Sequence, residues 1–179
     1  MKNSLFRQLV KFNNKKISVI VEMSGNHQGS LSGAKRFINT SIKSGADIIK
    51  FQVYTPDTIT LNTKKRDFLV KSGDKLKKYK DLYSLYKKAH TPWEWIEPLT
   101  KILNKKKIAW FASPFDITAV NFLEKLKCPA YKIASPEITD ISLIEKIASM
   151  NKPILLSTGV ATIKDIDLAL KTIKKKHNK

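Results

Sequence analysis

The chain has 179 residues, 42% hydrophobic and 27% charged, a composition that predicts one folded domain and excludes a disordered or fibrous protein. Lys and Arg number 34 against 15 Asp and Glu, a net charge of +19, yet the only arginines are Arg7, Arg36 and Arg66. Because proteins that read nucleic acid depend on the bidentate guanidinium group, we interpret the lysines as a solvated surface and predict no nucleic-acid partner.

The cysteine content and the hydropathy indicate where the chain works. Cys128 is the single cysteine, which excludes an internal disulfide and predicts a small buried side chain in a reducing compartment. No apolar run approaches the ~20 residues of a membrane span. The N-terminus has no uninterrupted apolar stretch of the kind found in signal peptides before Lys15 and Lys16. We therefore predict a cytoplasmic protein without a membrane partner.

Five short apolar runs, rich in β-branched and aromatic residues, predict buried β-strands. They cover residues 17–23, 46–54, 108–113, 130–135 and 153–158.

Stretches of helical period separate these runs. The first carries Leu31, Ala34, Ile38 and Ile42 on one face and ends at Gly45.

The second helix is predicted to begin with a capping box from Thr91 to Glu94, and Pro98 should bend or shorten it. Three later helices have predicted N-caps at Asp116, Asp140 and Thr162.

The alternation of strand and helix predicts an α/β protein with a parallel sheet, either doubly wound or a (β/α)8 barrel. Polar groups recur at the downstream strand ends, and no glycine-rich nucleotide-binding turn occurs, so we predict part of a TIM barrel with about five βα units. Residues 55–90 are too long for an ordinary connection and are predicted to form a lid-like insertion. A surface insertion without a role in the site is the alternative.

Two lysines, Lys50 and Lys132, lie within otherwise apolar strands and require anionic partners. Glu22 and Glu137 could form ion pairs with them, but on a barrel mouth we favour a ligand that carries a phosphate and a carboxylate. Further candidates are His27, in the loop after the first strand, and the hydroxyls of Ser113, Ser135 and Ser157.

Nine segments occur together in a pattern that resembles the N-terminal catalytic barrel of the sialic acid synthase family. They are residues 22–27, 45–47, 50–58, 82–86, 91–95, 113–116, 131–135, 137–138 and 156–159. Residues 24–27, Ser-Gly-Asn-His, and residues 91–95, Thr-Pro-Trp-Glu-Trp, are similar to the pseudaminic acid synthase branch of that family.

The resemblance implies a nonulosonic acid synthase that condenses phosphoenolpyruvate with a 2,4-diacetamido-2,4,6-trideoxyhexose and releases phosphate. A divalent metal, Mn²⁺ or Mg²⁺, is the implied cofactor. Glu22 and Glu137 would be catalytic, and Gln52 and Glu137 would face the sugar. Phosphoenolpyruvate would be bound by Lys50, Ser113, Lys132, Ser135 and Ser157.

Length is the main departure from this family, because eight βα units need about 250 residues. We expect an N-terminal lead-in (1–16), the first part of the barrel (17–174) and a basic tail (175–179). The later strands, the family's metal ligands and its C-terminal antifreeze-like domain would be absent, so no metal ligand is expected in this chain. Our hypothesis is a truncated synthase, from a broken gene or one half of a split enzyme, completed by a second copy or by a complementing C-terminal chain.

Three other interpretations stay open at this point. The substrate could be that of an N-acetylneuraminate synthase. Lys50 or Lys132 could form a Schiff base in a lysine-dependent aldolase. The chain could also be an inactive remnant that binds acidic surfaces through its positive charge.

Overall fold

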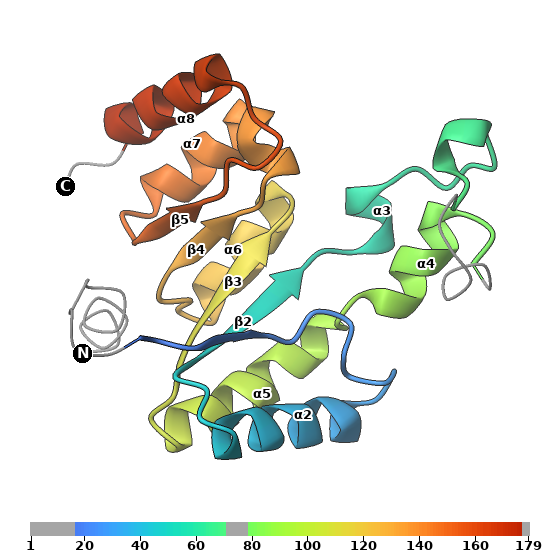
Figure 1. Ribbon diagram of the computed structural model, residues 1–179, viewed down its shortest axis with the longest axis vertical. Helices are drawn as coiled ribbons and strands as arrows, with labels where there is room; N and C mark the ends of the chain where they lie inside the picture. The colour runs from blue at the N-terminus through green and yellow to red at the C-terminus, as the bar shows by residue number, and fades with distance from the viewer. Residues whose placement is uncertain (1–16, 71–78, 177–179) are drawn as a thin grey trace.

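Five parallel strands form one sheet and follow each other in chain order, β1-β2-β3-β4-β5. The computed structural model (Figure 1) describes residues 17–70 and 79–176. The predicted lead-in (1–16) and the last residues of the predicted basic tail (177–179) lie outside the described residues. Because a doubly wound sheet reverses its strand order and a barrel does not, the chain order identifies part of a (β/α) barrel.

The strands and helices alternate as the sequence predicts, with boundaries shifted by up to three residues. The strands are β1 Ile20–Glu22, β2 Ile48–Val53, β3 Ala109–Pro114, β4 Tyr131–Ile133 and β5 Ile154–Leu156. The helices are α2 Leu31–Lys43, α3 Pro56–Ile59, α4 Leu82–Ala89, α5 Trp93–Lys105, α6 Ile117–Lys125, α7 Ile141–Ser149 and α8 Ile163–Lys176, with 3₁₀ turns at Arg66–Phe68 and Pro136–Thr139. Within the described ranges, none of these helices has the length and apolarity needed to cross a membrane.

The prediction that every strand is buried is wrong for the two outer strands. β1 and β5 each pair with one neighbour only among the described strands, and neither contains a fully buried residue. Ile20 in β1 is 40% exposed, and Ile17 just before it is 88% exposed. Burial of a parallel strand depends on neighbours at both edges, which the apolar character of the run cannot reveal.

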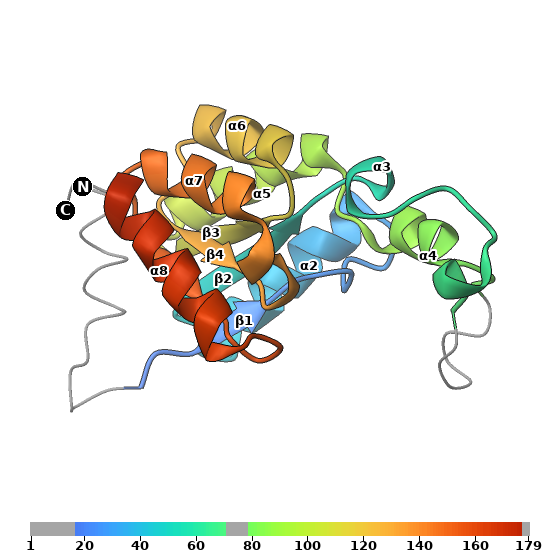
Figure 2. The same ribbon diagram turned by 90° about the horizontal axis from the view of Figure 1, so that it is seen from above.

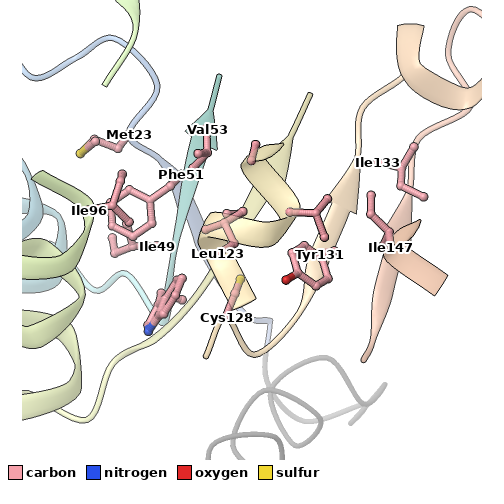
Figure 3. Close-up of a cluster of buried hydrophobic side chains, with 14 of the residues drawn as sticks. Met23, Ile49, Phe51, Val53, Ile96, Leu123, Cys128, Tyr131, Ile133 and Ile147 are labelled. Atoms are coloured by element: carbon pink, nitrogen blue, oxygen red, sulfur yellow. The ribbon is translucent and has the colours of Figure 1, made fainter. Parts of the chain in front are cut away.

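The main core lies between the sheet and the helices, which form an arc around the strands (Figure 2). Side chains of β2 and β4, including Phe51 and Tyr131, pack there against residues of α5, α6 and α7 (Figure 3). A second, smaller cluster lies on the opposite, inner face of the sheet and consists of Ile48, Ala109, Phe111 and Ala130, with Leu155 packed against them. The polar residues of the inner face lie on the same side of the sheet as this small apolar cluster.

Two of the predicted N-caps are confirmed directly. Asp116 accepts a hydrogen bond from Ala119 N at 2.9 Å, and Asp140 accepts one from Leu143 N at 2.9 Å. Thr162 also caps its helix, because its Oγ1 accepts from Asp165 N at 3.3 Å.

The predicted start of the second main helix, α5, is wrong. Its N-cap is Pro92 and not Thr91, because the Thr91 hydroxyl donates instead to Ser24 O at 3.3 Å. Of the two predicted effects of Pro98, shortening does not occur, since the helix has 13 residues and extends seven residues past Pro98 to Lys105. A proline inside a helix removes one backbone hydrogen bond, and the buried face of Ile96, Leu99 and Leu103 compensates for that loss.

Lysines concentrate in the last turns of the helices. In the helices of the βα units these positions are Lys43, Lys105, Lys125, Lys146, Lys174, Lys175 and Lys176. The partial negative charge at a helix C-terminus is stabilised by cations, and all helices of parallel βα units end on the same side of the sheet. Part of the net charge of +19 therefore lies at the end of the barrel opposite the carboxyl ends of the strands.

The long insertion after β2 contains α3 and α4, and in α4 the residues Leu82, Leu85, Tyr86 and Ala89 have helical spacing. Tyr83 OH in α4 donates to Asp57 Oδ1 in α3 at 2.9 Å, and both helices lie beyond the end of β2, away from α7 and α8 in both views (Figures 1 and 2). Residues 71–78 of the insertion lie outside the described residues. Its role as a lid stays a prediction.

Cys128 is fully buried, as predicted, and its Sγ donates to Ala130 O at 3.1 Å. Burial raises the pKa of the thiol to about 12. The thiolate is therefore disfavoured, which agrees with a structural side chain.

Glu124, close to Cys128, connects α6 with the start of β4 and β5. Its Oε1 accepts hydrogen bonds from Tyr131 OH and from Lys152 Nζ. We expect Glu124→Gln to lower the free energy of unfolding by about 1–2 kcal/mol, because a partly buried carboxylate that faces both a cation and a hydroxyl loses its charge. Urea unfolding followed by circular dichroism measures this loss.

Glu97→Gln is the matched control for this prediction. Glu97 forms an exposed pair with Lys101 at 2.8 Å, and exposed pairs contribute little to stability. Equal unfolding midpoints for the two variants would contradict a stabilising role of Glu124.

Candidate active site

The predicted site residues converge on the inner face at the carboxyl ends of the strands. The sheet register aligns Glu22 with Lys50 and Gln52 with Ser113. Lys132 lies opposite Leu155 of the inner cluster. Because side chains alternate along a strand, residues from four strands share one face.

Lys50 forms an ion pair with Glu22 across β1 and β2. The ion-pair alternative considered for the sequence is therefore present at this lysine. Burial, followed by the charge of Lys132, lowers the pKa of Lys50 to about 8. The protonation of Lys50 therefore depends on the charge of Lys132 in β4.

Lys132 and Glu137 form the other charged part of the site. Lys132 Nζ donates to Ile133 O at 2.8 Å. The pKa of Lys132 is lowered by burial, and the charge of Glu137 opposes this shift in part. Burial also raises the pKa of Glu137, and its Oε2 is buried without a hydrogen-bond partner in the described part of the chain. A half-buried carboxyl group of this kind can hold a proton and donate it.

The three predicted serines differ in how their hydroxyls are used. Ser113 is 1% exposed, and its Oγ has no hydrogen-bond partner among the described residues. Ser135 Oγ accepts from Val160 N at 2.9 Å, which leaves its proton to donate. Ser157 follows β5, and its N–H donates to Ile133 O at 3.1 Å. The hydroxyls of Ser113 and Ser135 can therefore both donate to an anion.

Ser24 is in this site although it is not among the predicted site residues. Its Oγ donates to Gln52 Oε1 at 3.0 Å, and its N–H donates to Glu22 Oε1 at 3.1 Å. The signals in the sequence are its position two residues after Glu22 and its place in the Ser-Gly-Asn-His segment, but neither reveals the hydrogen bond to Gln52, which crosses 28 positions of the chain.

His27, a candidate from the sequence, is a structural residue. It is 2% exposed, and its ring packs edge-on against Trp95 at 5.4 Å. Gly29 N donates to His27 Nδ1 at 3.0 Å, so Nε2 carries the proton and donates to Ala89 O at 3.2 Å. Both ring nitrogens are occupied, and the side chain holds the loop after β1 against the end of α4.

A metal site is not formed by the residues that the structure describes. No group of three or more His, Cys, Asp or Glu side chains in residues 17–70 and 79–176 lies close enough together to hold a metal ion. The described residues alone therefore do not form a site for the divalent metal that the resemblance implies, and the chemistry proposed for this chain uses protein side chains only.

Parallel strands in chain order, with charged and hydroxyl side chains at their carboxyl ends, define part of a (β/α) barrel of the kind that enzymes use. The chain belongs to the NeuB family, whose sequence profile matches residues 37–179.

Similar proteins support this membership. A pseudaminic acid synthase of Campylobacter jejuni is 42% identical over 174 residues, which cover 96% of this chain and 50% of the relative. A pseudaminic acid synthase of Helicobacter pylori is 42% identical over 160 residues, 89% of this chain and 46% of the relative. The crystal structure of N-acetylneuraminic acid synthetase from Leptospira borgpetersenii, in complex with citrate, matches with a TM-score of 0.77 and 30% identity over 92% of this chain and 52% of that one. The chain thus spans about half the length of these relatives.

Proposed function

We propose that this chain forms the phosphoenolpyruvate-binding part of a nonulosonic acid synthase of the pseudaminic acid type. The observation that carries the proposal is the presence of two partly buried lysines, Lys50 within β2 and Lys132 within β4, on one face of the sheet. Burial disfavours the charged form of both lysines, and the charge of Lys132 disfavours that of Lys50 further, so a ligand with two anionic groups is favoured between them. Phosphoenolpyruvate has a phosphate and a carboxylate.

Each side chain has a role in this proposal. Lys50 and Lys132 bind the two anionic groups, and Ser113, Ser135 and Ser157 donate hydrogen bonds to them. Gln52 faces the sugar, and Glu137, with its raised pKa, supplies a proton to the sugar oxygen. Glu22 keeps Lys50 charged and in position through their ion pair.

The proposed reaction joins carbon to carbon. The methylene carbon of phosphoenolpyruvate attacks the aldehyde carbon of the 2,4-diacetamido-2,4,6-trideoxyhexose, and the aldehyde oxygen takes a proton. Water adds to the neighbouring carbon, and the C–O bond to the phosphate then breaks, which leaves a keto acid and free phosphate. The pair Lys50 and Lys132 stabilises the negative charge throughout.

A partner for the outer strands is part of the proposal. Val19 and Ile20, at β1, are 48% and 40% exposed, and Ile163 and Leu170 in α8 are 74% and 43% exposed. Unpaired strand edges beside apolar side chains favour pairing with a further strand. We propose that a second copy or a complementing C-terminal chain supplies it.

A lysine-dependent aldolase is the second candidate, favoured by the lowered pKa of Lys50, about 8. A neutral amine can attack the carbonyl carbon of pyruvate, and the resulting adduct loses water to form a Schiff base. Borohydride reduction in the presence of pyruvate would then increase the mass of the chain permanently. Without such a product, this candidate is excluded.

The experiment that tests the proposed function measures phosphate released from phosphoenolpyruvate with the trideoxy diacetamido hexose, and N-acetylmannosamine as the comparison sugar. Manganese is present, and light scattering reports whether the mass exceeds the 20.4 kDa of one chain. We expect release with the diacetamido sugar, at a rate at least tenfold above that with N-acetylmannosamine. If the folded chain neither releases phosphate nor binds phosphoenolpyruvate, the proposal is wrong.

A further inference from the structure

Ser24 is the point at which three parts of the site region meet. Besides its bonds to Glu22 and Gln52, its carbonyl accepts from Thr91 Oγ1 at 3.3 Å. The loop after β1, the strand β2 and the chain just before α5 are therefore joined through one residue. Ser24 itself is half-buried.

The backbone of Ser24 is left-handed, with φ at +43°. This conformation is unfavourable for a serine and is adopted at little cost only by glycine. The bonds that Ser24 makes compensate for it, and its hydroxyl makes one that glycine could not make, the bond to Gln52 Oε1.

The hydrogen bond to Ser24 determines which end of the Gln52 amide remains available. A glutamine amide has one acceptor oxygen and an NH₂ group with two donor protons. Since Oε1 accepts from Ser24 Oγ at 3.0 Å, the Nε2 group is left to donate to a substrate. A fixed donor fits the carbonyl oxygen of an acetamido group or a hydroxyl oxygen of the sugar.

We propose that Ser24 is a positioning residue for sugar recognition, which holds Gln52 with its Nε2 group directed to the sugar. This inference rests on the proposed function for the identity of the ligand. Its geometric part, the fixed amide of Gln52, can be tested without any substrate.

The test uses protein labelled with ¹⁵N only in glutamine. The chain has three glutamines, Gln8, Gln28 and Gln52, so three side-chain amide pairs appear in the NMR spectrum, and Gln52→Ala identifies the pair of Gln52. Gln28 is exposed, accepts a long bond of 3.4 Å from Arg36, and is the internal control. Gln8 lies outside the described residues.

Two variants separate the effect of losing the Ser24 hydroxyl from the effect of relieving the left-handed backbone at this position. Ser24→Gly and Ser24→Ala both remove the hydroxyl, whereas only Ser24→Gly relieves the left-handed backbone. In both variants we expect the order parameter of the Gln52 side-chain amide to fall to that of Gln28, while the Gln28 signals stay unchanged. An unchanged Gln52 amide in both variants, or a change in Ser24→Ala alone, overturns the proposal.

Calorimetric titration then tests the sugar-binding part on the same samples. With phosphoenolpyruvate present, we expect Ser24→Gly to weaken binding of the diacetamido hexose about tenfold, and the affinity for phosphoenolpyruvate itself to stay within twofold. Equal sugar affinity in Ser24→Gly and the unsubstituted chain would overturn the proposed role. If the unsubstituted chain binds no sugar, the proposed function and this substrate role both fail, and the amide measurement still decides the geometric part.

Discussion

Lys132→Met and Lys50→Met are each expected to raise the dissociation constant of phosphoenolpyruvate about 10- to 100-fold. A hydrogen bond to a charged group is worth about 1.5–3 kcal/mol, and 1.4 kcal/mol corresponds to a factor of ten. Both lysines are partly buried within their strands, so water screens their charges less than at an open surface. Isothermal titration calorimetry measures the effect.

Lys101→Met is the matched control, because Lys101 is an exposed lysine in α5 that pairs with Glu97. It removes the same charge from the chain and should leave the dissociation constant within twofold. Circular dichroism confirms that each variant is folded. If folded Lys50→Met and Lys132→Met bind phosphoenolpyruvate as tightly as Lys101→Met, the inner face is not the binding site.

The affinity for phosphoenolpyruvate, measured by the same calorimetric titration, should depend on pH because Lys50 loses its charge as the pH rises. Its pKa is lowered to about 8, whereas an ordinary lysine has a pKa of 10.5. Binding of an anion needs the charged form, so the affinity should be full below pH 8 and fall about tenfold for each unit above it. Lys50→Arg should remove this decline, because the guanidinium stays protonated. A flat profile up to pH 10 in the unsubstituted chain would contradict the contribution of Lys50.

The second large effect is expected from Gly33→Ala, which should lower the free energy of unfolding by about 2–3 kcal/mol. A Cβ at position 33 would lie 2.2 Å from His27 O and 3.0 Å from Ser30 Oγ. The carbonyl cannot move easily, since His27 O accepts from Ser30 N and the His27 ring is held by Ala89 and Gly29. Overpacking of this kind typically costs about 1–3 kcal/mol.

Helix propensity alone predicts the opposite sign for Gly33→Ala, because alanine stabilises a helix by about 1 kcal/mol relative to glycine. Ser32→Ala, at the exposed position just before it in α2, is the control and should change stability by less than about 0.5 kcal/mol. Urea unfolding compares the two variants. A midpoint for Gly33→Ala at or above that of Ser32→Ala would contradict the close approach of the loop to the helix.

Much of the fold could be predicted because strands and helices leave periodic patterns in neighbouring residues. All five strands, the helix within the insertion and the caps Asp116 and Asp140 follow from spacing and residue type. The predicted cap at Thr91 is absent for a reason that the sequence does not contain, because its hydroxyl bonds to Ser24, 67 positions away. Periodicity alone does not distinguish a doubly wound sheet from a barrel; the polar strand ends predicted the barrel, and the strand order confirms it.

The sequence by itself determined the chemical types in the site: two lysines in apolar strands, carboxylates and hydroxyls at strand ends, and one cysteine suited to burial. The tertiary structure decided which of them meet. It paired Lys50 with Glu22, buried His27 against Trp95 and brought Ser24 to Gln52. The physical reason is that periodicity and capping act between near neighbours in the chain, whereas these contacts depend on strand register and on the path of one loop across 28 or more positions.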